Sequence, residues 1–104
     1  MNTLIAATNA FAIDATLALF SPDAVILDVS VGEQFTGHAG ISDYLKQYFV
    51  DYHTQTRLLS AEFKEQSQAN VRVDFTGDFG HEIGLLLFSF DTSWRIVRID
   101  AALE

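Results

Sequence analysis

Residues 18–28 read ALFSPDAVILD and mark the point where the chain changes from helix to strand. The segment Ser21-Pro22-Asp23 should end a helix, because proline disfavours helical backbone at the residue before it. The six residues that follow, 24–29, are short and β-branched, which predicts a strand. This apolar strand nevertheless carries a carboxylate near its end, at Asp28. Asp28 is therefore the first candidate functional residue.

The flanking sequence predicts three helices in the first half of the chain. Residues 3–20 carry two short apolar stripes, and Phe11-Ala12 between them predicts a break into two short helices. A glycine turn and a short partner strand over residues 33–36 should follow the first strand. The next helix should be amphipathic, because its apolar residues recur at i, i+3, i+4, i+7 and i+8. Those residues are Ile41, Tyr44, Leu45, Tyr48 and Phe49.

From residue 52 onward the hydrophobic period changes to two, which predicts successive strands. We expect strands over residues 53–63, 70–79, 82–91 and 94–103, joined by polar turns. Helices in one part of the chain and strands in another are typical of an α+β fold. The length of 104 residues suggests one domain, spanning residues 1–104.

The composition restricts the partners that the chain can have. Six basic and fourteen acidic residues give a net charge of −8, which repels nucleic acids and anionic membrane surfaces. No apolar run is long enough to span a bilayer. With no cysteine and three scattered histidines, we expect no metal site, and we expect no cofactor. The start of the chain has no cationic segment that would predict a signal peptide, so we expect a cytoplasmic protein.

A second group of candidate site residues lies on the strand expected over residues 53–63. His53, Gln55 and Arg57 alternate along it, so they should project from one face. The apolar residues that continue this alternation suggest that the face turns inward. His53 and Arg57 could then form a polar end to a pocket, where arginine could bind a carboxylate or hold an enolate oxygen. The alternative is a solvated strand end, or an Arg57 that pairs across the sheet or a dimer interface.

Three segments resemble the nuclear transport factor 2-like superfamily, in its ketosteroid isomerase and SnoaL-like branch. They are ALFSPDAVILD (18–28), GEQFTGHAGISDYL (32–45) and FSFDTSWRIVRI (88–99), and the order and length of the elements agree over the whole chain. The resemblance implies a strongly curved, mostly antiparallel sheet wrapped as a cone around three helices in the N-terminal half. It also implies a small apolar pocket inside the cone, and a homodimer formed through the sheet.

The resemblance implies a role for Asp28 as well. In the steroid isomerases, an aspartate at this position is the general base that moves a proton between carbon atoms. Tyr44 falls where those enzymes place an aromatic side chain that lines the pocket. Their two oxyanion donors, a tyrosine and a protonated aspartic acid, correspond to Leu4 and Leu86 here. One such donor is typically worth about 2.7–4 kcal/mol, so its loss argues against steroid isomerisation.

Two functions therefore remain open. The chain could bind a small apolar molecule in the cone without chemistry, in a pocket lined by Leu4, Tyr44, Tyr48, Leu86 and Phe88. Alternatively, it could be a cofactor-free acid–base enzyme of the isomerase, dehydratase or cyclase type. Asp28 would then take a proton, while His53 or Arg57 steadies the negative oxygen. The enzyme requires Asp28 and a hydrogen-bond donor to converge on one apolar cavity, whereas a binding module does not.

Overall fold

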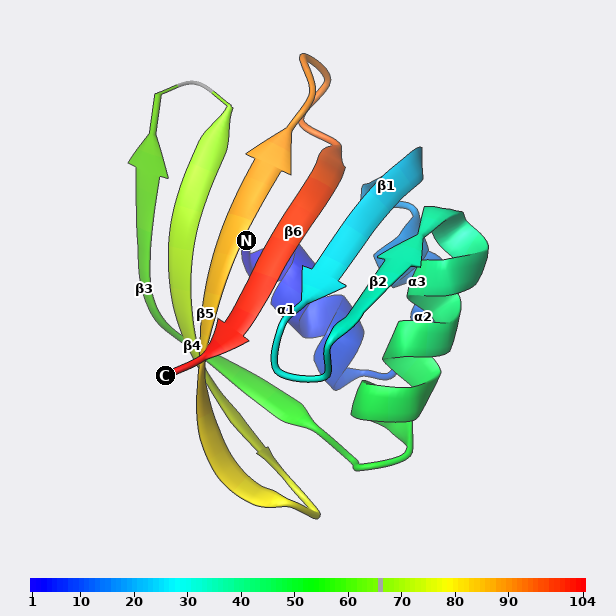
Figure 1. Ribbon diagram of the computed structural model, residues 1–104, viewed down its shortest axis with the longest axis vertical. Helices are drawn as coiled ribbons and strands as arrows, with labels where there is room; N and C mark the ends of the chain where they lie inside the picture. Colours follow the sequence, from blue (N-terminus) through cyan, green and yellow to red (C-terminus); the bar gives the residue numbers. More distant parts are fainter. Residues whose placement is uncertain (66) are drawn as a thin grey trace.

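Helices occupy the first half of the chain, as the periodicity predicted (Figure 1). In the computed structural model, which describes residues 1–65 and 67–104, α1 spans Asn2–Asn9 and α2 spans Ile13–Leu17. The predicted break between them is confirmed, and Phe11 takes a left-handed φ of 55° there. The third helix, α3, spans Gly37–Leu45 and continues as a π-helical turn, η1, over Lys46–Val50. Such wide turns are frequent at functional sites.

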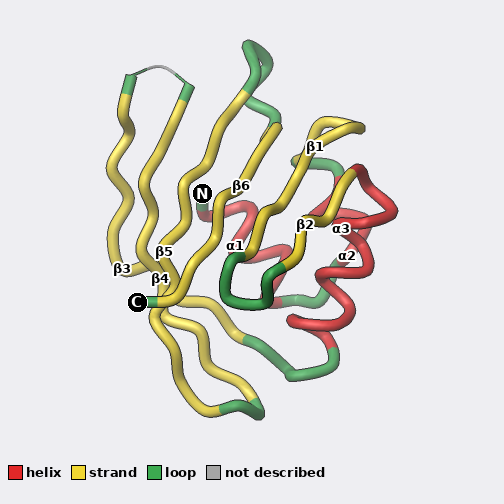
Figure 2. The backbone as a smooth tube through the Cα atoms, viewed as in Figure 1, coloured by secondary structure: helices red, strands yellow, loops and turns green. Residues whose placement is uncertain are grey.

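The strands form one mixed sheet, which confirms the predicted α+β class (Figure 2). Its strands are β1 (Phe20–Asp28), β2 (Glu33–Thr36), β3 (Gln55–Lys64), β4 (Gln68–Gly77), β5 (Gly80–Phe90) and β6 (Ile96–Leu103). Their order in the six-stranded sheet is β2-β1-β6-β5-β4-β3. The pair β1 and β6 is parallel, and each other neighbouring pair is antiparallel. The predicted turn between β3 and β4 contains residue 66, which lies outside the described residues.

The sheet curves around the side on which the helices lie (Figure 1). Helix α3 packs against β1 and β2, and α1 packs against β3 at the other edge. None of the helices in the described part of the chain is long and apolar enough to cross a membrane. The curved sheet and the helices thus enclose one interior, which the side chains of both layers share.

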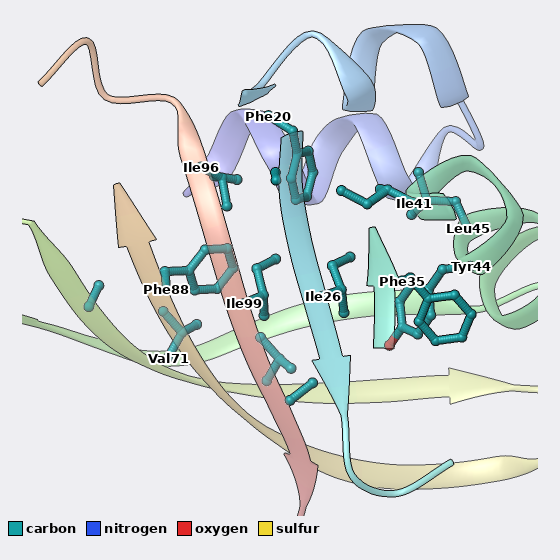
Figure 3. Packing of buried hydrophobic residues seen from close by; sticks show 14 residues of the cluster. Phe20, Ile26, Phe35, Ile41, Tyr44, Leu45, Val71, Phe88, Ile96 and Ile99 are labelled. Atoms are coloured by element: carbon teal, nitrogen blue, oxygen red, sulfur yellow. The ribbon is translucent and has the colours of Figure 1, made fainter. Parts of the chain in front are cut away.

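A single cluster of buried apolar side chains fills most of that interior (Figure 3). Alternate residues of each strand point into it, so the register decides which side chains meet. Ile26 of β1 lies opposite Ile99 of β6, and Phe88 of β5 lies opposite both Ile99 and Ala69. The cluster comprises Phe20, Ala24, Ile26, Phe35, Ile41, Tyr44, Leu45, Ala69, Val71, Val73, Phe88, Ile96, Ile99 and Ala101.

Candidate ligand cavity beside Asp28

Asp28 is a buried carboxylate at the C-terminal end of β1. Its position opposite Ala101 in the parallel register places it on the inward face of the sheet, and the residue is only 7% exposed. Its Oδ2 atom accepts a hydrogen bond of 2.6 Å from the Tyr44 hydroxyl. Its Oδ1 atom accepts two more, from the backbone N–H of Ser30 at 3.0 Å and from the Ser30 hydroxyl. Three donors therefore compensate the carboxylate for the water that it loses on burial.

Tyr44 is the residue that connects Asp28 to the helical layer. It projects from α3 into the aromatic cluster of the core, with its ring centroid 4.8 Å from that of Phe35 and 5.2 Å from that of Tyr48. Burial, followed by the hydrogen bond to Asp28, raises the pKa of Tyr44 well above its ordinary value. The phenol therefore keeps its proton at neutral pH and acts as a donor to Asp28.

Asp28 and Tyr44 line a cavity of about 310 Å³, which we call the Asp28 cavity. Its walls are mainly aromatic, and a few polar groups are set among them. The lining residues are Asp28, Ser30, Val31, Tyr44, Tyr48, Phe49, Tyr52, Thr54, Phe75, Phe79, Glu82 and Leu103. The combination of apolar walls and a few placed polar groups is typical of small-molecule sites.

A second, smaller cavity of about 60 Å³ lies deeper in the core, and we call it the apolar cavity. Tyr44, Phe49 and Phe75 line both cavities, so the two cavities lie next to each other. Engineered apolar cavities of about 150 Å³ bind benzene. The apolar cavity is smaller, so in this conformation it accepts a small apolar group rather than a whole ring system.

The residues predicted to line a pocket are divided between these two cavities. Leu4, Tyr44, Leu86 and Phe88 line the apolar cavity, while Tyr44 and Tyr48 line the Asp28 cavity. Leu4 and Leu86, which the resemblance predicted at the positions of the two oxyanion donors, contribute only hydrocarbon to the wall. Asp28 lines the larger cavity. It does not line the apolar cavity, and its connection to that cavity is the hydrogen bond from Tyr44, which lines both.

The structure corrects the inward placement that was predicted for His53 and Arg57. His53 precedes β3, its side chain is 72% exposed, and its Nδ1 atom lies 2.9 Å from Asp78 Oδ2. Arg57 lies on the outer face of the sheet opposite Asp74, and its Nη2 atom lies 3.0 Å from Asp74 Oδ2. Neither residue lines either of the two cavities. The cross-strand pairing of Arg57, which was the alternative interpretation, is what the structure shows.

A β-bulge explains why the alternation misled the prediction. The register of β3 against β4 shifts between Leu58 and Ser60, which adds one residue to β3. The apolar residues after the bulge therefore point inward, whereas Arg57 before it points outward. An uninterrupted alternation would have placed them all on one face.

The outward pair of Arg57 and Asp74 predicts a specific pH dependence. The hydrogen bond from Arg57, with a further contribution from His81, lowers the pKa of Asp74 in the folded protein. A carboxyl group whose pKa is lower in the folded protein than in the unfolded chain stabilises the fold at any pH above its unfolded pKa. This stabilisation is lost as the pH falls through the pKa of the folded protein. In Arg57→Gln the pKa of Asp74 should rise toward its unfolded value, so the variant should be less stable than the wild type at neutral pH and should lose less stability as the pH falls.

This prediction is checked by urea unfolding as a function of pH. The control is Lys64→Gln, which makes the same charge change on the same strand at an exposed position. If Arg57→Gln and the wild type were equally stable at neutral pH and lost equal stability in acid, the pairing would have no energetic role.

Sequence reasoning missed several residues that line the Asp28 cavity, above all Ser30 and Glu82. Ser30 had a local signal, since an aspartate side chain often bonds the backbone N–H two residues later in a turn. Glu82 shares the parity of Leu86 and Phe88 on β5, so alternation could have placed it inward. In the described parts of the chain, no group of three or more histidine, cysteine, aspartate or glutamate residues is placed to hold a metal ion.

Comparison with solved structures gives fold matches that cover nearly the whole chain. A protein from Sinorhizobium meliloti assigned as a polyketide cyclase matches with a TM-score of 0.87 and 22% identity, over 96% of this chain and 90% of its own. One from Kribbella flavida assigned as a ketosteroid isomerase has a TM-score of 0.85 and 16% identity, over 99% and 73%. A Mycobacterium tuberculosis protein in complex with estradiol-17β-hemisuccinate has a TM-score of 0.83 and 13% identity, over 96% and 87%.

These identities are low enough that the matches establish the fold and not a shared activity. A search of curated protein sequences gives no match. The sequence profile of the SnoaL-like domain, in contrast, matches residues 2–99. That match includes all the residues that line the two cavities except Met1, Ala101 and Leu103, and it reaches Ile99 of the last strand. The chain therefore belongs to the SnoaL-like domain family.

Proposed function

We propose that this protein binds a small, largely apolar ligand across the Asp28 cavity and the apolar cavity. The observation that carries the proposal is the shared wall, because Tyr44, Phe49 and Phe75 line both cavities. An apolar group of the ligand would enter the small inner space, and the rest would lie in the larger one. Burial of apolar surface supplies the affinity, at roughly 25 cal/mol per Å² before the costs of association.

The neighbouring residues Leu85 and Leu86 give a matched test of this site. Leu86 lines the apolar cavity, whereas Leu85 is 41% exposed on the outer face of the same strand. With toluene as the probe, the wild type and Leu85→Phe should show the same saturable chemical-shift changes in NMR. Leu86→Phe fills the cavity and should weaken toluene binding by tenfold or more. Equal binding by the two variants would place the ligand elsewhere.

The alternative function is acid–base catalysis with Asp28 as the base. The buried position of Asp28 in a cavity wall favours this alternative. Carboxylate oxygens have about four lone-pair sites, and three of those of Asp28 already accept hydrogen bonds, which leaves one on Oδ2 for a substrate proton. Leu4 and Leu86 themselves supply no oxyanion donor at the two positions where the resemblance to the steroid isomerases would require one, and for this reason binding is the better supported function.

Catalysis of this kind has a direct assay. An enzyme that abstracts protons next to a carbonyl would speed the exchange of the α-hydrogens of cyclohexanone in heavy water, as followed by NMR. We expect the exchange rate in the presence of the wild type or of Asp28→Asn to equal the exchange rate in buffer alone. Faster exchange with the wild type alone would replace the binding proposal by the enzymatic one.

We also propose that the protein forms a homodimer through the outer face of its sheet. Leu85 lies there beside Ala102 in the register, and Leu87 and Leu27 flank Asp100. These side chains form an apolar strip on the outer face of the sheet, and the helices cover only the inner face (Figure 1). Large exposed apolar patches often mark interfaces.

The dimer is tested by sedimentation at micromolar concentration. The wild type should sediment as a dimer and Leu85→Lys as a monomer, because the lysine would bury a charge in the interface. Val29→Lys, at a residue that is 63% exposed at the end of β1, should remain dimeric. A monomeric wild type would contradict the proposal.

A further inference from the structure

We propose that the Asp28 cavity selects a ligand that carries a positive charge, namely a small alkyl- or arylammonium ion. This inference rests on the proposed function, because it names the chemical class of ligand for the same site. It follows from two independent features of the walls, which are the sign of their ionisable groups and the arrangement of their aromatic rings.

The ionisable side chains that line the Asp28 cavity are all acids. They are the carboxyl groups of Asp28 and Glu82 and the phenols of three tyrosines, and no lysine, arginine or histidine lines it within residues 1–65 and 67–104. Glu33 lies opposite Asp28 in the β1–β2 register and adds to the same field. Burial, with contributions from Glu33 and Asp28, raises the pKa of Tyr48. The cavity therefore disfavours an anionic ligand and attracts a cation.

Aromatic rings also line much of the Asp28 cavity. Tyr48, Tyr52 and Phe79 line it together with Phe49 and Phe75. The rings of Tyr52 and Phe79 meet edge to face with centroids 6.1 Å apart, and those of Phe49 and Phe75 do so at 5.9 Å. Ammonium ions are attracted to aromatic faces, and several such rings around one site recognise alkylammonium groups in proteins. An apolar body with a cationic end thus matches both the rings and the carboxylates.

The basic side chain that is adjacent to the lining residues in the sequence does not enter the cavity. His53 follows Tyr52 in the chain, but it lies outside the cavity and contacts Asp78 at 2.9 Å. Glu82 lines the cavity and makes no ion pair among the described residues, so its charge is available to a ligand. The carboxylate of Asp28 is held by hydroxyl and backbone donors rather than by a cation.

Three probes of the same shape test the inference, namely benzylammonium, benzyl alcohol and benzoate. Their affinities for the full chain are measured by NMR titration at neutral pH and low salt, where benzylamine is protonated. Benzylammonium should bind at least tenfold more tightly than benzyl alcohol, and benzoate should bind most weakly. The advantage of benzylammonium should shrink as salt is added, because the Debye length falls to about 10 Å at 0.1 M.

Glu82→Gln and Glu62→Gln form a matched pair of variants. Both residues are exposed on strands, and both changes remove one negative charge, but Glu62 lies on β3 away from the Asp28 cavity. Glu82→Gln should weaken benzylammonium binding about threefold to fivefold and leave benzyl alcohol unchanged. Glu62→Gln should change neither affinity.

The outcomes separate this inference from the proposed function on which it rests. If benzylammonium and benzyl alcohol bind equally well, charge selection is overturned and the binding site stands. If Glu82→Gln and Glu62→Gln weaken benzylammonium equally, the effect comes from net charge and the inference is again overturned. If none of the three probes binds, the proposed function and the inference both fail.

Discussion

Replacing Phe88 with alanine should lower the free energy of unfolding by about 3–5 kcal/mol, the usual range for a buried phenylalanine. Phe88 is 1% exposed and is the largest of the fully buried side chains. Its ring lies on the inward face of β5, between the partners Ala69 and Ile99 in the register. These neighbours belong to paired strands and cannot collapse far into the space, so most of the cavity should persist.

Urea unfolding measures this loss, and Phe63→Ala is the control. Phe63 is 56% exposed, so its removal should cost less than about 1 kcal/mol. Because Phe88 lines the apolar cavity, the variant should also bind benzene and be stabilised by it more than the wild type is. Equal stability of the two alanine variants would show that Phe88 is not a central residue of the core.

Replacing Asp28 with alanine should cost about 3 kcal/mol. The change leaves the hydroxyl of Tyr44 buried without an acceptor, and it removes both hydrogen bonds that fix Ser30. Hydrogen bonds to charged groups contribute about 1.5–3 kcal/mol, and a buried group left unpaired costs about 1–3 kcal/mol. A loss of 3 kcal/mol corresponds to a melting temperature lowered by roughly 12–24 °C in a domain of about this size.

Asp28→Asn separates the charge of Asp28 from its hydrogen-bonding geometry. The amide keeps one oxygen as an acceptor for Tyr44 or Ser30, so its cost should lie between those of the wild type and the alanine variant. Asp43→Ala, at an exposed position on α3, should change the stability by less than about 0.5 kcal/mol. If Asp28→Ala were as stable as Asp43→Ala, the three hydrogen bonds to Asp28 would contribute nothing to the fold.

Local sequence patterns predicted the elements well because each one is encoded by neighbouring residues. The break at Phe11 and the strand over Glu33–Thr36 lie where the sequence indicated. The predicted change from helix to strand at Pro22 is wrong, because α2 ends at Leu17 and β1 begins at Phe20, which pairs with Ile96 of β6 and places the proline inside the strand. Such pairing depends on a strand that is distant in the chain.

The candidate site was predicted only in part, for the same physical reason. The resemblance to the steroid isomerases implied that Asp28 faces the pocket, but its contact with Tyr44 joins residues on two separate elements. The outward direction of Arg57 depends on a bulge that no local pattern announced. The division of the interior into two cavities depends on how Tyr44, Phe49 and Phe75 pack, which is set by the three-dimensional fold.

Intermolecular NOEs between toluene and the wild-type protein show directly whether the interior beside Asp28 binds a ligand. We expect NOEs from bound toluene to the rings of Tyr44 and Phe49 and to the methyl groups of Leu86, which together line the two cavities. NOEs only to outer-face residues such as Leu85 and Leu87, or none at saturating toluene, would contradict it.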